Sequence, residues 1–164
     1  MISTELKSQI QGAYSRFLEA KSLKPRYGQR LMIAEVAKVL GDIDTDDEGR
    51  RSGDPAIVAV EAGTGTGKTV AYSLAAIPTA KAAGKRLVIA TATVALQEQR
   101  VHKDLPDLMR NAGLQFSFAL AKGRGRYLCL SKLDMLLQEG QAQSATAQMF
   151  EEEYRRAAKL PAYQ

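Results

Sequence analysis

The sequence predicts an α/β fold in which a parallel β-sheet is flanked by helices. Three runs rich in β-branched or aromatic residues, at 56–60, 86–91 and 114–121, alternate with helical patterns. Such alternation is typical of parallel sheets with right-handed crossovers. A glycine-rich turn joins the first run to the next helix. The first two runs are short and apolar, which predicts strands buried on both faces.

Two helices are expected before the first strand, within residues 1–41. Apolar residues recur at helical spacing over 6–18, and Ser3 or Thr4 can accept hydrogen bonds from the free amides of the first turn. A second helical pattern spans 31–40 and stops at Gly41.

Residues 42–55 are expected to form an exposed acidic loop. Six acidic residues stand against two arginines there, a local net charge of −4 in a chain whose net charge is +5. The body of the chain is therefore basic, which is compatible with a polyanionic partner.

The remaining helices follow the predicted strands. One begins near Lys68, with Pro78 expected to kink or end it and Gly84 to close the segment. The other helical patterns span 94–109, 128–137 and 145–158, the first with a break near Pro106.

The segment 61–69, Glu-Ala-Gly-Thr-Gly-Thr-Gly-Lys-Thr, is predicted to be a P-loop that binds ATP. Glycines let backbone amides approach an anion, and the following helix N-terminus adds partial positive charge. Lys68 can reach the outer phosphates, and the Thr69 hydroxyl can ligate Mg²⁺, so these two are the expected catalytic residues. The alternative is a glycine-rich turn that binds nothing. The predicted cradle consists of Ala62, Gly63, Thr64, Gly65, Thr66, Gly67, Lys68 and Thr69.

Several segments together resemble the DinG family of bacterial iron–sulfur DNA helicases, which are relatives of XPD in superfamily 2. Residues 61–69 resemble motif I, Pro25–Ile33 resembles the Q motif, and Thr91–Gln99 resembles motif Ia. Two further segments, 103–106 and 123–129, agree in the same order. The resemblance covers residues 1–137 approximately.

The resemblance implies a P-loop NTPase fold of the RecA-like type, with an incomplete motor domain. The implied organisation is N-terminal helices with the Q motif at 1–41, the acidic loop at 42–55, the first half of motor domain 1 at 56–121, and the start of an iron–sulfur region at 122–164. The implied activity is ATP-dependent translocation on single-stranded DNA in the 5′-to-3′ direction, with duplex unwinding.

The resemblance also assigns roles to residues outside the P-loop. Arg26 and Gln29 would bind the nucleotide, since a glutamine amide can pair with the adenine edge. Cys129 would be one of four ligands of a [4Fe–4S] cluster in the full-length protein. In isolation, Gln29 would be a solvated glutamine and Cys129 a buried hydrophobic residue.

Two groups of residues are candidates for contacts with single-stranded DNA. Thr91 and Thr93 follow the second predicted strand, at the sheet edge where ligands bind. Their hydroxyls could hold a phosphate, or Thr93 could cap a helix, and both roles are compatible. In the basic loop, Lys122, Arg124 and Arg126 suit phosphates and Tyr127 could stack on a base. The alternative is a solvated basic loop.

The chain lacks parts that the resemblance requires for catalysis. These are three cysteines, an Asp-Glu box and a second motor domain with an arginine finger. The chain is thus expected to be the N-terminal piece of a helicase, inactive by itself. The alternatives are a small P-loop NTPase or kinase and a non-catalytic nucleotide-binding module. One cysteine and no apolar stretch of about 20 residues predict a cytoplasmic protein without a membrane span, and we expect it to be monomeric.

Overall fold

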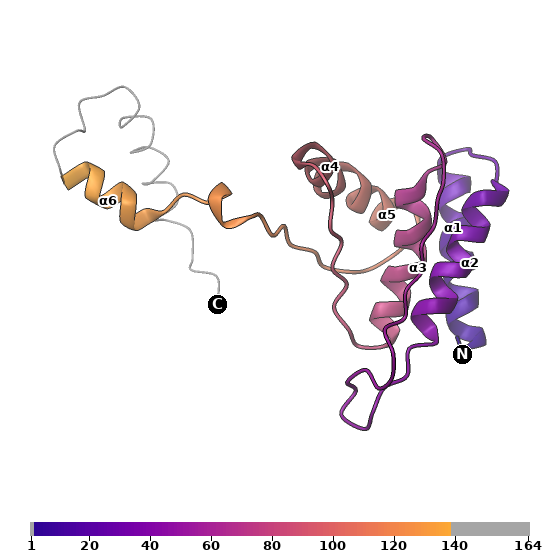
Figure 1. The fold of residues 1–164 in the computed structure, drawn as a ribbon. Coiled ribbons are helices and arrows are strands. Elements are labelled where there is room, and N and C mark those ends of the chain that lie inside the picture. Colours follow the sequence, from indigo (N-terminus) through magenta and orange to yellow (C-terminus); the bar gives the residue numbers. More distant parts are fainter. Residues whose placement is uncertain (1, 139–164) are drawn as a thin grey trace. The chain divides into compact units, whose positions relative to one another are not determined.

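The computed structural model describes residues 2–138, and the ordered elements in that range are helical (Figure 1). The predicted helix at 145–158 lies outside the described residues. The chain divides into two compact units, residues 1–118 and 119–164. The elements are α1 (Thr4–Ala20), α2 (Tyr27–Gly41), α3 (Lys68–Ala82), α4 (Val94–Gln99), the π-helix η1 (Arg100–Asp104), α5 (Leu105–Asn111), the 3₁₀ turn η2 (Arg124–Arg126) and α6 (Leu130–Gln138).

The two N-terminal helices are confirmed. The Ser3 hydroxyl caps α1 by accepting a hydrogen bond from the Leu6 amide at 3.1 Å. Helix α2 begins at Tyr27, four residues before the apolar pattern that predicted it, and includes Gly41 as its last residue. The apolar spacing therefore identified both helices but not the start of the second.

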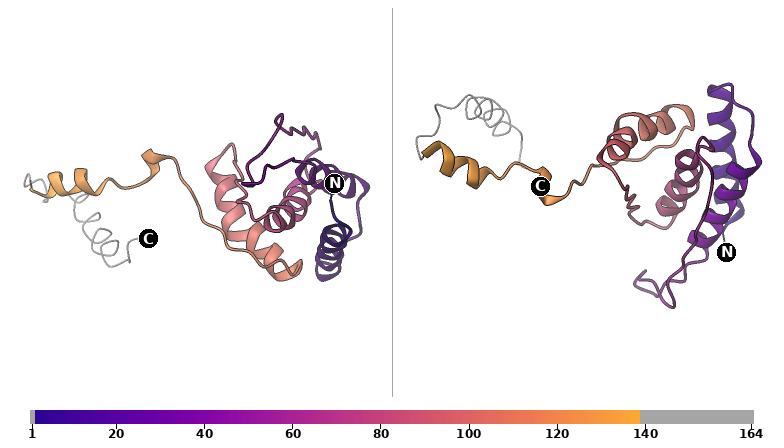
Figure 2. Two further views of the ribbon diagram at one scale, coloured as in Figure 1. Left: turned by 90° about the horizontal axis from the view of Figure 1, so that it is seen from below. Right: turned by 45° about the horizontal axis from the view of Figure 1, so that its top comes forward.

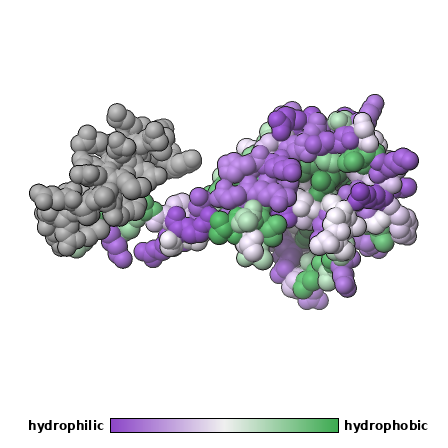
Figure 3. Space-filling model, turned by 90° about the horizontal axis from the view of Figure 1, so that it is seen from above, coloured by the Kyte–Doolittle hydropathy of each residue, from purple (hydrophilic) through white to green (hydrophobic). Residues whose placement is uncertain are grey.

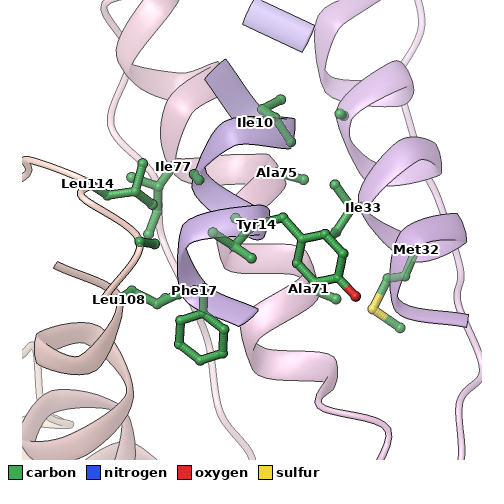
Figure 4. Close-up of a cluster of buried hydrophobic side chains, with 14 of the residues drawn as sticks. Ile10, Tyr14, Phe17, Met32, Ile33, Ala71, Ala75, Ile77, Leu108 and Leu114 are labelled. Carbon is green, nitrogen blue, oxygen red and sulfur yellow. The ribbon is translucent and has the colours of Figure 1, made fainter. Parts of the chain in front are cut away.

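The core of the first unit is built by helices. Helix α3 packs against both α2 and α1, and α1 also contacts α5, as the views in Figures 1 and 2 show. Leu74 of α3 and Leu108 of α5 are fully buried. The cluster that joins these helices is drawn in Figure 4 and includes Ile10, Tyr14, Phe17, Met32, Ile33, Ala71, Ala75, Ile77, Leu108 and Leu114.

Pro78 does not end its helix, so that part of the prediction is wrong. Helix α3 continues through Pro78 to Ala82, and the proline side chain is fully buried in the core. The next residue, Thr79, is also buried, and its hydroxyl donates to the Ala75 carbonyl at 2.7 Å. Burial of apolar surface on all sides of this helix offsets the hydrogen bond that proline cannot donate.

The helical stretch 94–111 is interrupted earlier than predicted. The interruption is the π-turn η1 at Arg100–Asp104, whereas Pro106 lies in the first turn of α5. A proline is tolerated in that turn because the amide it lacks would have no partner within the helix. The break near Pro106 is therefore displaced to the residues just before it.

The predicted parallel sheet is not confirmed by the structure. Within residues 2–138, β-pairing is limited to one isolated antiparallel bridge between Thr45 and Arg51. Segments 56–60 and 86–91 are non-helical but unpaired. Their predicted burial is wrong, since Ile57 is 82% and Val88 is 87% exposed. Figure 3 shows hydrophobic side chains that reach the surface between hydrophilic ones.

The exposure of these segments follows from what surrounds them. A parallel strand is buried only when strands flank it and helices cover both faces of the sheet. In the described part of the chain the helices pack against one another, and neither segment has a neighbouring strand. The third predicted strand, 114–121, differs at its start, where Leu114 is buried and Phe116 packs against the helical core.

The acidic loop at 42–55 is mostly exposed, as expected, and folds back on itself. The Asp46 carboxylate accepts hydrogen bonds from the amides of Glu48 at 3.0 Å and Arg50 at 2.7 Å. The Lys85 ammonium donates to the Gly49 carbonyl and ties the loop to the end of the α3 segment. No helix within residues 2–138 combines the length and apolar character needed to cross a bilayer.

Candidate phosphate-binding site

The glycine-rich loop at 62–67 connects segment 56–60 to the first turn of α3. Gly65 and Gly67 have φ values of +80° and +77°, in the left-handed region that favours glycine. Gly67 is the N-cap of α3, so the helix begins at Lys68. The loop backbone therefore delivers Lys68 and Thr69 to a helix N-terminus, where free amides and partial positive charge favour an anion.

The Lys68 ammonium lies across the loop. It donates to the Ala62 carbonyl at 2.7 Å and to the Gly63 carbonyl at 2.9 Å. The Thr66 hydroxyl also donates to the Gly63 carbonyl. These acceptors are neutral, and an ionised phosphate oxygen accepts a stronger hydrogen bond from an ammonium than they do. The arrangement holds the lysine where it can exchange carbonyl contacts for a phosphate.

Two residues from the start of α2 reach the same loop, although they precede it by 38 and 39 positions. The Arg26 guanidinium donates to the Gly65 carbonyl at 2.6 Å. The Gln29 amide donates to the Gly67 carbonyl at a longer 3.4 Å. The structure thus brings the predicted nucleotide-binding residues of both segments together.

Gly67 leaves no room for a side chain. A β-carbon built there would lie 2.1 Å from the Gln29 amide nitrogen, and the positive φ would strain any other residue. The present position of the Gln29 amide against the loop therefore requires glycine here, and the positive φ favours it independently.

Tyr14 is a member of the site that the sequence did not single out. Its hydroxyl donates to the side-chain Oε1 of Gln29 at 3.1 Å and accepts from the backbone amide of Arg26 at 3.3 Å. The sequence placed Tyr14 only on the apolar face of the first helix. The available signal was its hydroxyl, because a buried tyrosine usually needs a polar partner. Tyr14 anchors the start of α2 to α1.

A cavity of about 670 Å³ opens beside the loop and α3. Its walls include Thr64, Gly65, Gly67, Lys68, Thr69, Tyr72, Arg100, Leu96, Met32, Val36, Val58 and Val60. Tyr72 and Arg100 were not predicted to belong to the site. Burial raises the pKa of Tyr72, despite the opposing effects of the Arg100 cation and of the nearby Thr69 side chain. The phenol therefore keeps its proton at neutral pH.

The residues present fit a magnesium ion bound together with a nucleotide. Mg²⁺ retains several waters and commonly takes one or two protein oxygens plus substrate phosphates. The Thr69 hydroxyl on the first turn of α3 could supply one such oxygen. No group of three or more His, Cys, Asp or Glu side chains within residues 2–138 could hold a metal by itself.

Thr91 and Thr93 lie at the start of α4, in the same unit as the loop. The Thr93 hydroxyl accepts from the Leu96 amide at 3.2 Å, which confirms the helix cap. The Thr91 hydroxyl donates to the Thr93 carbonyl at 3.3 Å. Both side chains keep some exposure, and the free amides of this helix start are available to an anion.

The basic loop and Cys129 belong to the second unit. Arg124 and Arg126 occupy the turn η2, and the Tyr127 hydroxyl accepts from the Lys122 amide at 2.9 Å. That bond closes the loop upon itself and leaves the Tyr127 ring exposed. Cys129 is an exposed free thiol. It is the only cysteine of the chain, so this chain does not fit a [4Fe–4S] cluster, which four thiolates hold.

Comparison with known proteins identifies a family whose members are similar to this chain. The family described as DEAD/DEAH box helicase matches residues 50–157. The chain is 42% identical over 135 residues to the ATP-dependent DNA helicase DinG of Photobacterium profundum, a match that covers 82% of the chain. It is 41% identical over 136 residues to the protein of that name from Escherichia coli. The chain spans 18% of the length of either relative. The resemblance stated from the motifs is confirmed.

Proposed function

The chain belongs to the DEAD/DEAH box helicase family, and from that premise we propose that it is the N-terminal, nucleotide-binding part of a DinG-type ATP-dependent DNA helicase. Membership of this family implies a P-loop NTPase fold. In the whole protein, ATP binding and hydrolysis would drive translocation along single-stranded DNA and duplex unwinding. The similar proteins named above are ATP-dependent DNA helicases, which supports the proposal.

One observation carries the nucleotide site: the convergence of Arg26 and Gln29 on the glycine-rich loop. A loop that bound only phosphate would not require an amide side chain beside it. A glutamine amide offers a donor and an acceptor, the pair that the adenine edge requires. The loop and α2 together therefore support ATP as the ligand rather than an isolated anion.

Roles follow for the residues of the cradle. The amides of 63–67 would surround the β-phosphate, and Lys68 would neutralise charge on the outer phosphates. The Thr69 hydroxyl would ligate Mg²⁺, which supplies charge neutralisation between the phosphates when bound. Gln29 would exchange its long contact with Gly67 for the base.

The unpaired segments of the first unit would form a parallel sheet in the whole motor domain. Segments 56–60 and 86–91 carry β-branched apolar residues that are exposed here, and such residues are stable when a sheet and its covering helices bury them. Segment 114–121 already places Leu114 and Phe116 against the helical core.

Two regions would contact the DNA strand. The start of α4 offers Thr91, Thr93 and free amides to a phosphate, and Arg124 and Arg126 offer charge. Tyr127 would stack on a base, since its ring is exposed while its hydroxyl is held. Contacts of this kind do not depend on base sequence.

Cys129 would be one cluster ligand in the full-length protein only, where further thiolates could complete the set. The single cysteine excludes an internal disulfide and supports a reducing compartment such as the cytoplasm.

The test is ATP hydrolysis by the full-length protein with and without single-stranded DNA. We expect hydrolysis that rises with DNA and is lost in Lys68→Ala. A small P-loop kinase would instead transfer phosphate to another acceptor without any response to DNA. A non-catalytic module would bind ATP without turnover. Either result would contradict the helicase assignment.

A further inference from the structure

A row of hydrogen bonds leads from helix α1 to the glycine-rich loop, and each bond in it has a defined direction. The backbone amide of Arg26 donates to the Tyr14 hydroxyl at 3.3 Å. That hydroxyl donates to Oε1 of Gln29 at 3.1 Å. The Nε2 atom of Gln29 then donates to the Gly67 carbonyl at 3.4 Å. Tyr14 is buried in the helical core (Figure 4), whereas Gln29 is only partly buried.

The two ends of the row determine how the Gln29 amide is oriented. A backbone amide can only donate, and a backbone carbonyl can only accept. Turning the Gln29 amide by 180° would place Oε1 against the Gly67 carbonyl, which is another acceptor. It would also leave the proton of the buried Tyr14 hydroxyl without an acceptor, at the cost of an unmade hydrogen bond. The row therefore selects one of the two orientations of the amide.

The orientation of the amide decides which purine it can recognise. Adenine presents its N6 amino donor beside the N7 acceptor, whereas guanine presents the O6 acceptor beside N7. Hypoxanthine, like guanine, has an oxygen at position 6. Oε1 of Gln29 has two lone pairs and Nε2 has two hydrogens, and the row uses one of each. The remaining acceptor and donor match adenine, whereas Oε1 would oppose the oxygen of a 6-oxopurine.

We propose that Tyr14 is a positioning residue for base selection, whose hydroxyl holds the Gln29 amide in the orientation that favours adenine over 6-oxopurines. Tyr14 acts through Gln29 and does not contact the nucleotide. The longer bond to Gly67 gives way to the base, and the bond from Tyr14 persists. The inference rests on the proposed ATP site and goes beyond it, because it assigns base selection to a residue of α1, outside the P-loop and the segment 25–33.

The test compares the binding of ADP and inosine diphosphate (IDP) to the full-length protein with Mg²⁺, by calorimetry. These nucleotides differ at position 6 of the purine, and neither has a γ-phosphate to hydrolyse. Wild type should prefer ADP by about 5- to 100-fold, because IDP exchanges a hydrogen bond for two opposed acceptors. Tyr14→Phe keeps the buried ring and removes the hydroxyl. It should reduce the preference by about two- to tenfold, because the amide can then turn its NH₂ group toward the oxygen.

The ratio of the two affinities separates base selection from stability. Partial unfolding of Tyr14→Phe would weaken ADP and IDP binding by the same factor and leave the ratio unchanged. Ser3→Ala is the matched control, because it removes one hydrogen bond from the first turn of the same helix. It should leave the ratio at the wild-type value. A wild-type ratio in Tyr14→Phe, or an equal reduction in Ser3→Ala, would overturn the proposal.

Gln29→Ala distinguishes this inference from the proposed function. It should remove the preference for ADP, and adding Tyr14→Phe should change the ratio no further, because Tyr14 acts through Gln29. A further reduction in the double variant would refute that route. If Gln29→Ala keeps the wild-type preference, Gln29 does not read the base and the proposed adenine contact is wrong. If Gln29→Ala removes the preference while Tyr14→Phe retains it, only the role of Tyr14 is wrong.

Discussion

Replacement of Lys68 by alanine should weaken ATP binding by about 5- to 150-fold. An ammonium about 4 Å from a phosphate charge contributes about 4 kcal/mol at an effective dielectric constant of 20. In the structure, however, Lys68 already donates to the carbonyls of Ala62 and Gly63, and ATP must replace those bonds. Each replaced bond offsets about 0.5–1.5 kcal/mol, which leaves about 1–3 kcal/mol in favour of phosphate.

The assay is calorimetric titration of ATP with Mg²⁺ into wild type, Lys68→Ala and the control Lys7→Ala. Lys7 is exposed on α1, outside the loop and the cavity, so its loss should leave affinity unchanged. Circular dichroism should show the same helix content in all three proteins, because water can reach the carbonyl of Gly63. Equal ATP affinity in Lys68→Ala and wild type would refute the assignment of this loop as the phosphate site.

Three other predictions test the anchoring of α2, the role of Cys129 and the role of the basic loop. Tyr14→Phe removes two hydrogen bonds that hold the start of α2, and it should lower the free energy of unfolding by about 1 kcal/mol. Urea titrations measure this change. An unchanged midpoint of unfolding would contradict the anchoring role of Tyr14. The purified 164-residue chain should be free of iron, because it has a single cysteine. In the full-length protein, Cys129→Ser should diminish the visible absorption of an iron–sulfur cluster. Full iron content in that variant would exclude Cys129 as a cluster ligand. The third prediction concerns three cations of the basic loop and is measured by fluorescence anisotropy with single-stranded DNA. Alanine at all three positions should lower the slope of log affinity against log salt concentration by up to about 2. An unchanged slope would show that the loop does not contact DNA. These cations are Lys122, Arg124 and Arg126.

The helical part of the fold could be predicted because its determinants are local. Apolar spacing and the Ser3 cap are properties of neighbouring residues, and α1 forms where they indicate. The path of α3 through Pro78 was not predictable in that way, because burial by distant helices decides it. The sheet is not confirmed for a related reason: strands need partners, and segments 56–60 and 86–91 have none within residues 2–138.

The residues of the candidate site also differ in whether local sequence or contacts with distant residues determine their role. Lys68 and Thr69 were identified from a contiguous motif, since one loop and one helix start create their chemistry. Tyr14, Tyr72 and Arg100 were missed because contacts between residues distant in sequence bring them to the site. Arg26 and Gln29 came from the resemblance, and the structure brings them to the loop.

The exposed segments at 56–60 and 86–91 also bear on how copies of the chain meet one another. Unpaired backbone flanked by apolar β-branched side chains acts as a template for another extended chain. Association of this kind increases with protein concentration. The packing of the helical core within each copy does not depend on concentration. Dilution and chaperones would therefore govern how much of this chain stays dispersed. The apolar residues that the proposed sheet would bury are the ones expected to promote aggregation while they remain exposed.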